Sequence, residues 1–223
     1  MKIMYVPSVK DFPDAVRLTA LALKKNHLAV IPTETSYGLA ALASSKKAVK
    51  KIHAAKKQQR TKAVSIIVPS LKVAEKYGVL GKDAKALARK FMPGPLTLVV
   101  PAKKTAHHLG GKTIAFRISS NRFAHALCTK LGDAITATSA NIHGEPDTYS
   151  SKKAEELFFG KALVVVDAGK LPKARPSTVY EVATGKVLRR GKISEKEIKK
   201  ALKKKHEKQM KKQETQHLRL KNF

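Results

Sequence analysis

Residues 28–38 read LAVIPTETSYG, and this stretch decides how the rest of the chain is interpreted. The apolar run at 28–31 stops at Pro32, which is typical of a short buried strand and its end. Residues 33–37 follow at once, and all of their side chains except that of Glu34 carry a hydroxyl group. The stretch therefore predicts a strand that leads directly into a turn crowded with small hydrogen-bonding groups.

Strand and helix patterns alternate along the rest of the chain. Apolar residues at helical spacing predict helices over 14–26, 44–57, 82–91, 122–132 and 151–160. Apolar and β-branched runs predict strands over 27–32, 64–68, 96–101, 113–118, 134–139, 162–169, 177–183 and 186–191. This alternation is typical of an α/β fold, and the late strands without helices indicate a mixed, twisted open sheet flanked by helices.

The composition argues against several classes of protein. The single cysteine, Cys128, allows no disulfide within the chain and no zinc site built from cysteines, and we expect it to be a core residue. No run approaches 18 apolar residues and the N-terminal segment lacks a secretory signal, so we expect a cytoplasmic protein with no membrane contact. The P-loop, G-x-S-x-G and H-x-x-x-H patterns are absent. We therefore expect no metal held by protein side chains and no serine nucleophile.

The charge is the strongest compositional signal. There are 46 basic and 16 acidic residues, and the formal net charge of +30 attracts polyanions such as nucleic acid and nucleotides. We predict a catalytic domain over 1–193 and a lysine-rich tail over 194–223. Ser194 and Glu197 have capping-box spacing, so the tail is expected to begin with a helix, whose apolar stripe starts at Ile198. Beyond this start the tail is expected to be helical or disordered. It either binds nucleic acid or is a solvated end of the chain.

Basic and small polar side chains stand at the predicted element ends. They are Thr33, Thr35, Tyr37, Lys56, Arg117, Thr138, Ser139, Asn141, Ser177 and Arg189. Ligands of open α/β sheets bind outside the strand ends. Arginine grips phosphate oxygens with two parallel hydrogen bonds, and hydroxyl and amide groups suit a small zwitterion. Taken singly, a Thr or Ser at a strand end is more often a turn residue. Together these residues predict a site for a nucleotide phosphate and a zwitterionic molecule.

The order of the motifs resembles the YrdC/Sua family of threonylcarbamoyl-AMP synthases over about residues 10–192. The motifs are PTETSYGL, Lys56 ahead of KAVSIIV, PGPLTLVV, AFRI, ATSANIHGEP, PSTVYEV and VLRRGKIS. The resemblance implies a YrdC-like fold and a reaction in which L-threonine and bicarbonate or CO2 give a carbamate. An oxygen of the carbamate attacks the α-phosphate of ATP, pyrophosphate leaves, and Mg2+ accompanies the triphosphate. The product, L-threonylcarbamoyl-AMP, is used by a separate tRNA-modifying transferase.

The resemblance also implies roles for individual residues. Lys56 and Arg117 match catalytic basic positions, because fixed cations stabilise the charge that develops on the phosphates. We expect ATP to contact Lys56, Arg60, Ser139, Asn141, Ser177 and Arg189, and threonine to contact Thr33, Thr35, Tyr37, Arg117 and Thr138. The hydroxyl-rich turn is then a recognition loop for threonine, with Gly38 letting the backbone approach closely. Thr35 either binds threonine or braces the turn, and Glu34 is expected to face outward.

The sequence departs from the family pattern at several points. Gln58 stands where the family usually has the arginine of a Lys-x-Arg motif, and Arg60 is the candidate to reach the same phosphate. Ser119 replaces a proline that commonly follows AFRI. We also expect the chain to lack the second, C-terminal domain of longer family members.

The alternative function is a module of the same fold that binds double-stranded RNA or tRNA without catalysis. The net charge, the lysine-rich tail and the loss of an arginine at Gln58 favour it. The absence of tryptophan and an aromatic content of 5% argue against single-stranded RNA, whose bases stack on aromatic side chains.

Overall fold

The computed structural model describes residues 4–6, 12–59 and 61–203. The strands are β1 (Met4–Val6), β2 (Leu28–Pro32), β3 (Tyr37–Ala40), β4 (Ile66–Ile67), β5 (Leu96–Pro101), β6 (Thr113–Arg117), β7 (Ile135–Thr136), β8 (Thr138–Ser139), β9 (Ala162–Val166), β10 (Thr178–Glu181) and β11 (Lys186–Arg189). The helices are α1 (Phe12–Lys24), α2 (Lys46–Ala55), α3 (Leu71–Tyr77), α4 (Lys82–Phe91), the 3-10 helix η2 (Lys104–Leu109), α5 (Arg122–Leu131), α6 (Ser151–Phe158) and a helix over 195–203.

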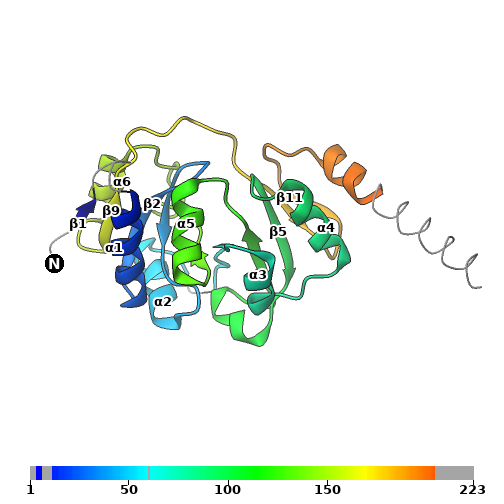
Figure 1. The fold of residues 1–223 in the computed structure, drawn as a ribbon, viewed down its shortest axis with the longest axis horizontal. Helices are drawn as coiled ribbons and strands as arrows, with labels where there is room; N and C mark the ends of the chain where they lie inside the picture. Colours follow the sequence, from blue (N-terminus) through cyan, green and yellow to red (C-terminus); the bar gives the residue numbers. More distant parts are fainter. Residues whose placement is uncertain (1–3, 7–11, 60, 204–223) are drawn as a thin grey trace, which may run out of the picture.

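The strands form two sheets that lie next to one another (Figure 1). One sheet has five strands in the order β1-β9-β2-β3-β8, and the other has six in the order β11-β10-β5-β6-β4-β7. Both sheets mix parallel and antiparallel pairs: β2 pairs with β9 in parallel and with β3 antiparallel, and β5 pairs with β10 in parallel and with β6 antiparallel. The predicted mixed, open α/β fold is therefore confirmed.

The two sheets are joined where one predicted strand divides. The run at 134–139 was expected as a single strand, but β7 pairs with β4 in one sheet and β8 pairs with β3 in the other. A bridge between Leu42 and Ile135 and a hydrogen bond from the Thr136 N–H to the Ala41 carbonyl, 2.9 Å long, continue β3 alongside β7. The chain thus passes from one sheet to the other around Ala137, which brings the ends of β2, β3 and β8 next to the six-stranded sheet.

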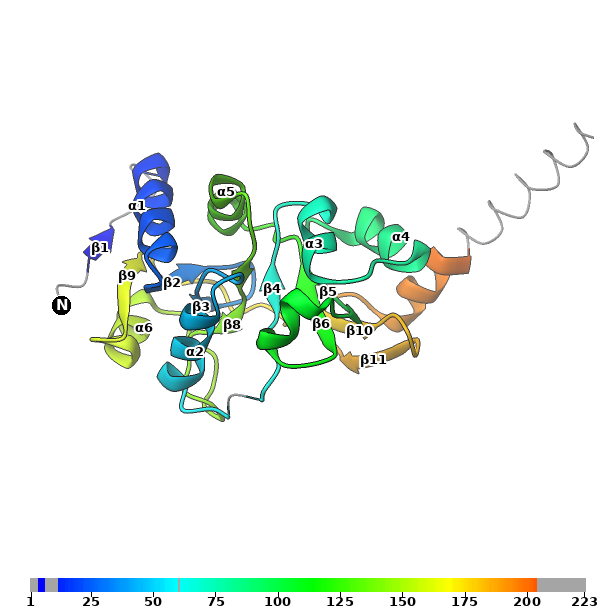
Figure 2. The same cartoon turned by 90° about the horizontal axis from the view of Figure 1, so that it is seen from below.

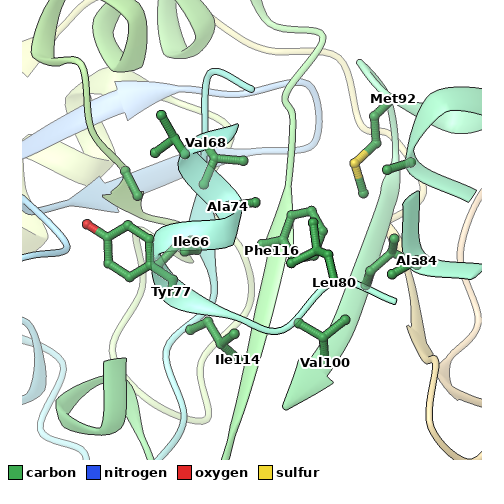
Figure 3. Packing of buried hydrophobic residues seen from close by; sticks show 14 of the residues in the cluster. Ile66, Val68, Ala74, Tyr77, Leu80, Ala84, Met92, Val100, Ile114 and Phe116 are labelled. Carbon is green, nitrogen blue, oxygen red and sulfur yellow. The ribbon is translucent and has the colours of Figure 1, made fainter. Parts of the chain in front are cut away.

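Alternation along the strands gives the six-stranded sheet two different faces. Val100, Ile114 and Phe116 pack with Ala84 and Met92 in one hydrophobic core (Figure 3). These strand residues share one face of the sheet, because side chains at every second position of a strand point to the same side. Residues of α3 and α4 cover this face and complete the core. The intervening residues, which include Thr97, Ala115 and Arg117, point to the opposite face. That face is where the polar cavity described below is found.

The five-stranded sheet is covered by helices on both faces. Figure 2 shows α1 and α5 along one side of these strands and α2 and α6 along the other. Ile31 packs with residues of α1 and α5, while Val30 packs with residues of α2 and α6. Cys128 of α5 is buried in the first of these cores, as expected, and burial raises the pKa of its thiol to about 12. In the described ranges no helix is both long and apolar enough to span a bilayer.

The start of the predicted tail forms the expected helix and packs on the domain. Ser194 and Glu197 make the capping box: the Ser194 N–H donates to the Glu197 carboxylate (2.9 Å) and the Glu197 N–H donates to Ser194 Oγ (3.3 Å). Ile198 is fully buried in the core under α4, and Ala201 and Leu202 pack against it. The predictions for residues 204–223 lie outside the described residues.

Several elements were missed by the sequence patterns. β1, α3 and η2 were not predicted, and β3 begins at Tyr37, within the stretch that was expected to be a loop. The run predicted as a strand over 64–68 pairs only at Ile66 and Ile67. The missed strands are short and depend on pairing with other strands more than on local propensity, and α3 and η2 are short helices of 7 and 6 residues.

Candidate active site

A polar cavity of about 160 Å3 lies where the two sheets meet. The first sheet and its turn contribute Ile31, Thr33, Thr35, Ser36, Tyr37, Gly38, Thr138 and Ser139. The second sheet and its loops contribute Ser65, Ile67, Thr97, Ala115, Arg117, Thr136, Ala137, Pro176, Val179 and Arg189, and the loop between β8 and α6 contributes Asp147. Seven of the predicted site residues therefore line one cavity: Thr33, Thr35, Tyr37, Arg117, Thr138, Ser139 and Arg189.

The hydroxyl-rich turn is organised by Thr33. Its Oγ1 donates to the Ser36 carbonyl (2.7 Å) and accepts from the N–H groups of Thr35 (3.2 Å) and Ser36 (3.3 Å). Thr35 Oγ1 lies 3.1 Å from Thr33 Oγ1. A β-carbon at Gly38 would lie 3.3 Å from Thr33 Cγ2 and 3.5 Å from the Thr138 carbonyl, so the glycine allows β8 and the turn to pack closely. The Thr33 hydroxyl thus shapes the turn, and that of Thr35 is better placed to meet a ligand.

Tyr37 lines the cavity while its hydroxyl group is bonded elsewhere, and its predicted contact with threonine stays a prediction. The hydroxyl group donates to the Gly169 carbonyl (2.8 Å) and accepts from the Ala168 N–H (2.9 Å), and the side chain is fully buried. Burial is the main cause that raises the pKa of this phenol. Tyr37 therefore forms part of the cavity wall while its hydroxyl ties the start of β3 to the segment after β9.

Arg117 is a buried cation whose end groups lack a protein partner. It is 7% exposed, and its Nε lies 3.0 Å from Glu34 Oε1. This contact is an ion pair without hydrogen-bond geometry, and among residues 4–6, 12–59 and 61–203 no hydrogen bond from its two Nη groups to an acceptor is found. A buried guanidinium costs free energy unless its N–H groups are satisfied, so the cavity is built for an anionic group. Glu34, which was expected to face outward, instead points toward Arg117.

Arg189 is the second cation of the cavity, and Ser177 holds it. Arg189 Nε donates to the Ser177 carbonyl (3.1 Å) and Nη2 donates to Ser177 Oγ (2.8 Å). Thr97 Oγ1 lies 2.9 Å from the same Oγ, on the buried side. Burial, and after it the charge of Arg117, lowers the pKa of Arg189. Ser177 was predicted to contact ATP, but it does not line the cavity and acts here on the position of Arg189.

Lys56 and Asn141 lie behind the cavity wall. Lys56 caps α2, and its Nζ donates to the carbonyls of Ser139 (2.6 Å) and Asn141 (2.7 Å) and to Asn141 Oδ1 (2.7 Å). Ser139 Oγ donates to the same Oδ1 (2.7 Å). The three protons of the ammonium group are thus used on residues 139–141. Lys56 thus fixes the loop that carries Ser139, and its predicted contact with ATP stays a prediction.

Some residues near the site were not predicted, and some predictions are not placed. Asp147 lines the cavity from an exposed position, although no motif had assigned it a role. Thr97 and Thr136 were missed because a threonine inside an apolar strand gives no signal of its own. Gln58 Nε2 lies 3.1 Å from His53 Nδ1 and does not line the cavity. Arg60 lies outside the described residues, so its predicted contact with ATP stays a prediction.

A second, larger cavity is lined by Glu34, whose neighbours Thr33 and Thr35 line the first. It has a volume of about 670 Å3 and a largely apolar lining that includes Phe12, Phe123 and Leu171, together with Glu34 and Arg122. Phe12 and Phe123 pack edge to face with ring centres 5.9 Å apart, and Arg122 lies over the Phe12 ring.

Comparison with known proteins gives the family to which this chain belongs. The family model Sua5/YciO/YrdC, described as "Telomere recombination", matches residues 21–191. This chain belongs to the Sua5/YciO/YrdC family. The match includes every residue that lines the cavity. It leaves out residues 1–20 and 192–223, and thus the whole helix over 195–203.

Relatives in the Sua5/YciO/YrdC family are named as synthases. A threonylcarbamoyl-AMP synthase of Pyrococcus abyssi is 34% identical over 174 residues, which are 75% of this chain and 50% of that protein. One of Thiobacillus denitrificans is 33% identical over 171 residues, 75% of this chain and 90% of that protein. This chain therefore spans about half the length of the P. abyssi relative and matches most of the shorter one.

Solved structures of the Sua5/YciO/YrdC family share the fold. The crystal structure of P. abyssi Sua5 complexed with L-threonine matches with a TM-score of 0.81 and 31% identity, over 90% of this chain and 61% of that one. E. coli YciO matches with a TM-score of 0.76 over 88% of this chain and 98% of its own, but at 22% identity it supports the fold alone.

Proposed function

We propose that this chain is an L-threonylcarbamoyladenylate synthase, a nucleotidyltransferase that forms threonylcarbamoyl-AMP and pyrophosphate from L-threonine, bicarbonate or CO2, and ATP. One observation carries the proposal: the buried Arg117 lines a cavity rich in hydroxyl groups, and among the described residues its ion pair is with Glu34 through Nε. Relatives at about one third identity are named as synthases of this product, and one related structure holds L-threonine.

The size of the polar cavity suits an amino acid better than a whole nucleotide. Pockets for drug-sized molecules measure roughly 300–1,000 Å3, and this cavity measures about 160 Å3. Threonine offers a carboxylate for Arg117 and a hydroxyl group for Thr35 or Thr138. The triphosphate then meets Arg189 and Ser139 at the cavity, and the rest of the nucleotide extends beyond it.

The residues that line the cavity can position the substrates and stabilise the negative charge of the transition state. The proposed reaction needs no side-chain nucleophile. The threonine amine loses a proton and bonds to the carbon of CO2, which gives a carbamate. A carbamate oxygen then forms a bond to the α-phosphorus, and the bond from that phosphorus to the oxygen that bridges the α- and β-phosphates breaks, so that this oxygen leaves as a terminal oxygen of pyrophosphate. Negative charge grows on the phosphate oxygens, where Arg117 and Arg189 stabilise it. The structure offers these two cations within one lining.

Mg2+ is proposed to enter with ATP. Mg2+ prefers oxygen ligands and usually keeps several waters and substrate phosphates in its shell. Asp147 is the carboxylate that lines the cavity from an exposed position, so it is the protein group that would contact the ion. No group of three or more candidate ligands occurs among the residues that the structure describes. The ion would therefore be held mainly by the triphosphate.

The first experiment measures turnover. Purified protein is incubated with ATP, Mg2+, bicarbonate and radiolabelled L-threonine, with L-serine as a substrate control, and both pyrophosphate and AMP-linked product are counted. Arg117→Ala should lower the rate about 10²–10³-fold, as the loss of one oxyanion-hole donor does. Arg89→Ala, an exposed position on α4, is the matched control. Threonine-independent pyrophosphate release, or none from a folded protein, would overturn the proposal.

RNA binding is the second candidate function, and the helix over 195–203 favours it. Its buried Ile198 fixes the helix on the domain, and Lys196, Lys199, Lys200 and Lys203 are exposed. Such an exposed lysine row suits the phosphates of a double-stranded RNA or tRNA. A synthase whose product is passed to a tRNA-modifying transferase in the cytoplasm would gain from this contact, so the two functions are compatible.

A further inference from the structure

Glu34 is the one carboxylate of the recognition turn, and it is directed inward. Its side chain is 13% exposed, although the turn that carries it lies at a strand end. One carboxylate oxygen, Oε1, lies 3.0 Å from Arg117 Nε, in an ion pair that does not have hydrogen-bond geometry. The other, Oε2, accepts a short hydrogen bond from Ser119 Oγ. A nearly buried carboxylate is costly unless it is paired in this way, so this placement needs a reason.

Ser119 anchors Glu34 to the start of α5. The Asn121 N–H donates to Ser119 Oγ (3.2 Å), while Asn121 Oδ1 caps the helix by accepting from the N–H groups of Phe123 (3.0 Å) and Ala124 (3.1 Å). Ser119 is 1% exposed. The carboxylate is thus fixed by a rigid element and not by a mobile side chain.

The contact with Glu34 determines which end of Arg117 faces the cavity. Because Glu34 occupies the Nε side of the guanidinium, the two Nη groups are the ones left for a ligand. Arginine binds a carboxylate or phosphate through a planar fork of N–H groups, and its orientation matters as much as its charge. Without Glu34, the long side chain would have several orientations available.

We infer that Glu34 is a positioning residue for Arg117, fixed in turn by Ser119, and that it sets the affinity for the anionic group of the amino-acid substrate. The inference rests on the proposed function, which supplies that substrate. Glu34 touches no reacting atom. It acts by holding the Arg117 fork toward the polar cavity.

Charge and position make opposite predictions for Glu34→Gln. Removing a negative charge beside Arg117 raises the positive potential of the cavity, so an effect of charge alone would strengthen anion binding and lower the KM for L-threonine. Losing the ion pair frees the guanidinium, and misplacement by about 1 Å can cost on the order of 10²-fold. The sign of the change in KM therefore separates the two explanations.

The experiment measures steady-state pyrophosphate release and L-threonine binding by calorimetry for the full chain and its variants. Glu34→Gln should raise the KM and Kd for L-threonine roughly tenfold to a hundredfold, with a smaller change in kcat and in the KM for ATP. Ser119→Ala should raise the same constants by a smaller factor, because it leaves the carboxylate but removes its anchor. Glu156→Gln, an exposed carboxylate on α6, is the matched control and should behave as the wild type.

A double-mutant cycle between Glu34 and Arg117 tests whether Glu34 acts through Arg117. A purely structural role of Glu34 would give no coupling between the two substitutions. If Glu34 acts through Arg117, then Glu34→Gln should have much less effect in an Arg117→Lys background, since lysine has no fork to orient. Full and independent effects in the double variant would overturn the inference. Melting curves establish that each variant is folded, and if Glu34→Gln fails to fold, Ser119→Ala decides.

The outcomes also separate this inference from the proposed function. If the wild type is active and Glu34→Gln leaves the KM and Kd for L-threonine unchanged or lowers them, the positioning role is overturned. The proposed synthase function is then unaffected. A folded wild type that neither binds L-threonine nor releases pyrophosphate overturns the proposed function, and the role of Glu34 falls with it.

Discussion

Lys56 places an ammonium group inside the protein, where it is 3% exposed and meets three oxygen atoms of Ser139 and Asn141. Burial disfavours the charged form and lowers the pKa of this lysine from 10.5 to about 8, with a smaller opposing effect of Asp147. The residue therefore combines a structural task, fixing the loop at 139–141, with a charge that is costly to bury.

The buried charge of Lys56 predicts a pH dependence of stability. Between pH 8 and 10.5 the unfolded chain binds this proton and the folded chain has released it, so the free energy of unfolding should rise with pH across that window. The gain at this residue should reach about 3 kcal/mol. Urea unfolding of the wild type and of Lys56→Met should show it as a difference between the two curves. A difference that stays constant from pH 7 to 11 would contradict the depressed pKa.

At the scale of the elements, Gly191 allows two segments to cross at the edge of the site. A β-carbon there would lie 2.3 Å from the Pro176 carbonyl, 2.4 Å from the Thr178 nitrogen and 2.5 Å from the Ser177 carbonyl carbon. The chain after β11 therefore runs directly over the start of β10. Since Ser177 holds Arg189, this crossing determines where the second cation of the cavity lies.

Gly191→Ala should consequently damage both stability and activity. The clash is with backbone atoms that cannot rotate away, so we expect a loss of roughly 1–3 kcal/mol in the free energy of unfolding and a fall in turnover as Arg189 shifts. Gly81→Ala is the matched control, because a β-carbon there meets no atom within 4 Å. Urea unfolding and pyrophosphate release measure the two effects. Equal behaviour of the two variants would show that the crossing is not tight in solution.

At the scale of the whole molecule, the net charge of +30 and the two-sheet architecture serve different ends. The cavity uses two arginines, whereas most of the lysines are on the surface, including the row on the helix over 195–203. This helix packs beside α4 (Figure 1), on the six-stranded sheet whose opposite face carries the cavity. Binding of a polyanion there and turnover in the cavity are therefore separable.

RNA binding should depend steeply on salt, and turnover should not. The combined variant Lys196→Gln/Lys200→Gln/Lys203→Gln should reduce the slope of log K against log salt for double-stranded RNA by about 3, one for each lost phosphate contact. Pyrophosphate release should be unchanged, because these residues lie outside the cavity. Fluorescence anisotropy at about 50 to 200 mM salt measures the slope, because the affinity of phosphate-driven binding changes roughly 10³-fold over this range. An unchanged slope would rule this helix out as an RNA contact.

Local chemistry was sufficient for much of the fold. β5 has the predicted bounds, α5 ends at Gly132 in a left-handed conformation (φ 64°), and the capping box at Ser194 forms. The glycine end of α5 and the capping box depend on residues within a few positions of one another, and the bounds of β5 follow its apolar run, so these features could be predicted from the sequence. The order of motifs likewise predicted the family and seven residues that line one cavity.

Only the tertiary structure decided how the site residues divide their tasks. Glu34 turns inward because Arg117 and Ser119, 83 and 85 positions away in sequence, supply its partners. Lys56 lies behind the cavity because the loop at 139–141 surrounds its ammonium group. The strand at 134–139 divides because its two halves find different neighbours. The sequence determined the elements and the chemistry available at their ends, since these follow from local periodicity. Which group meets the ligand and which group holds another in place depends on contacts between distant segments, and these exist only once the two sheets are joined.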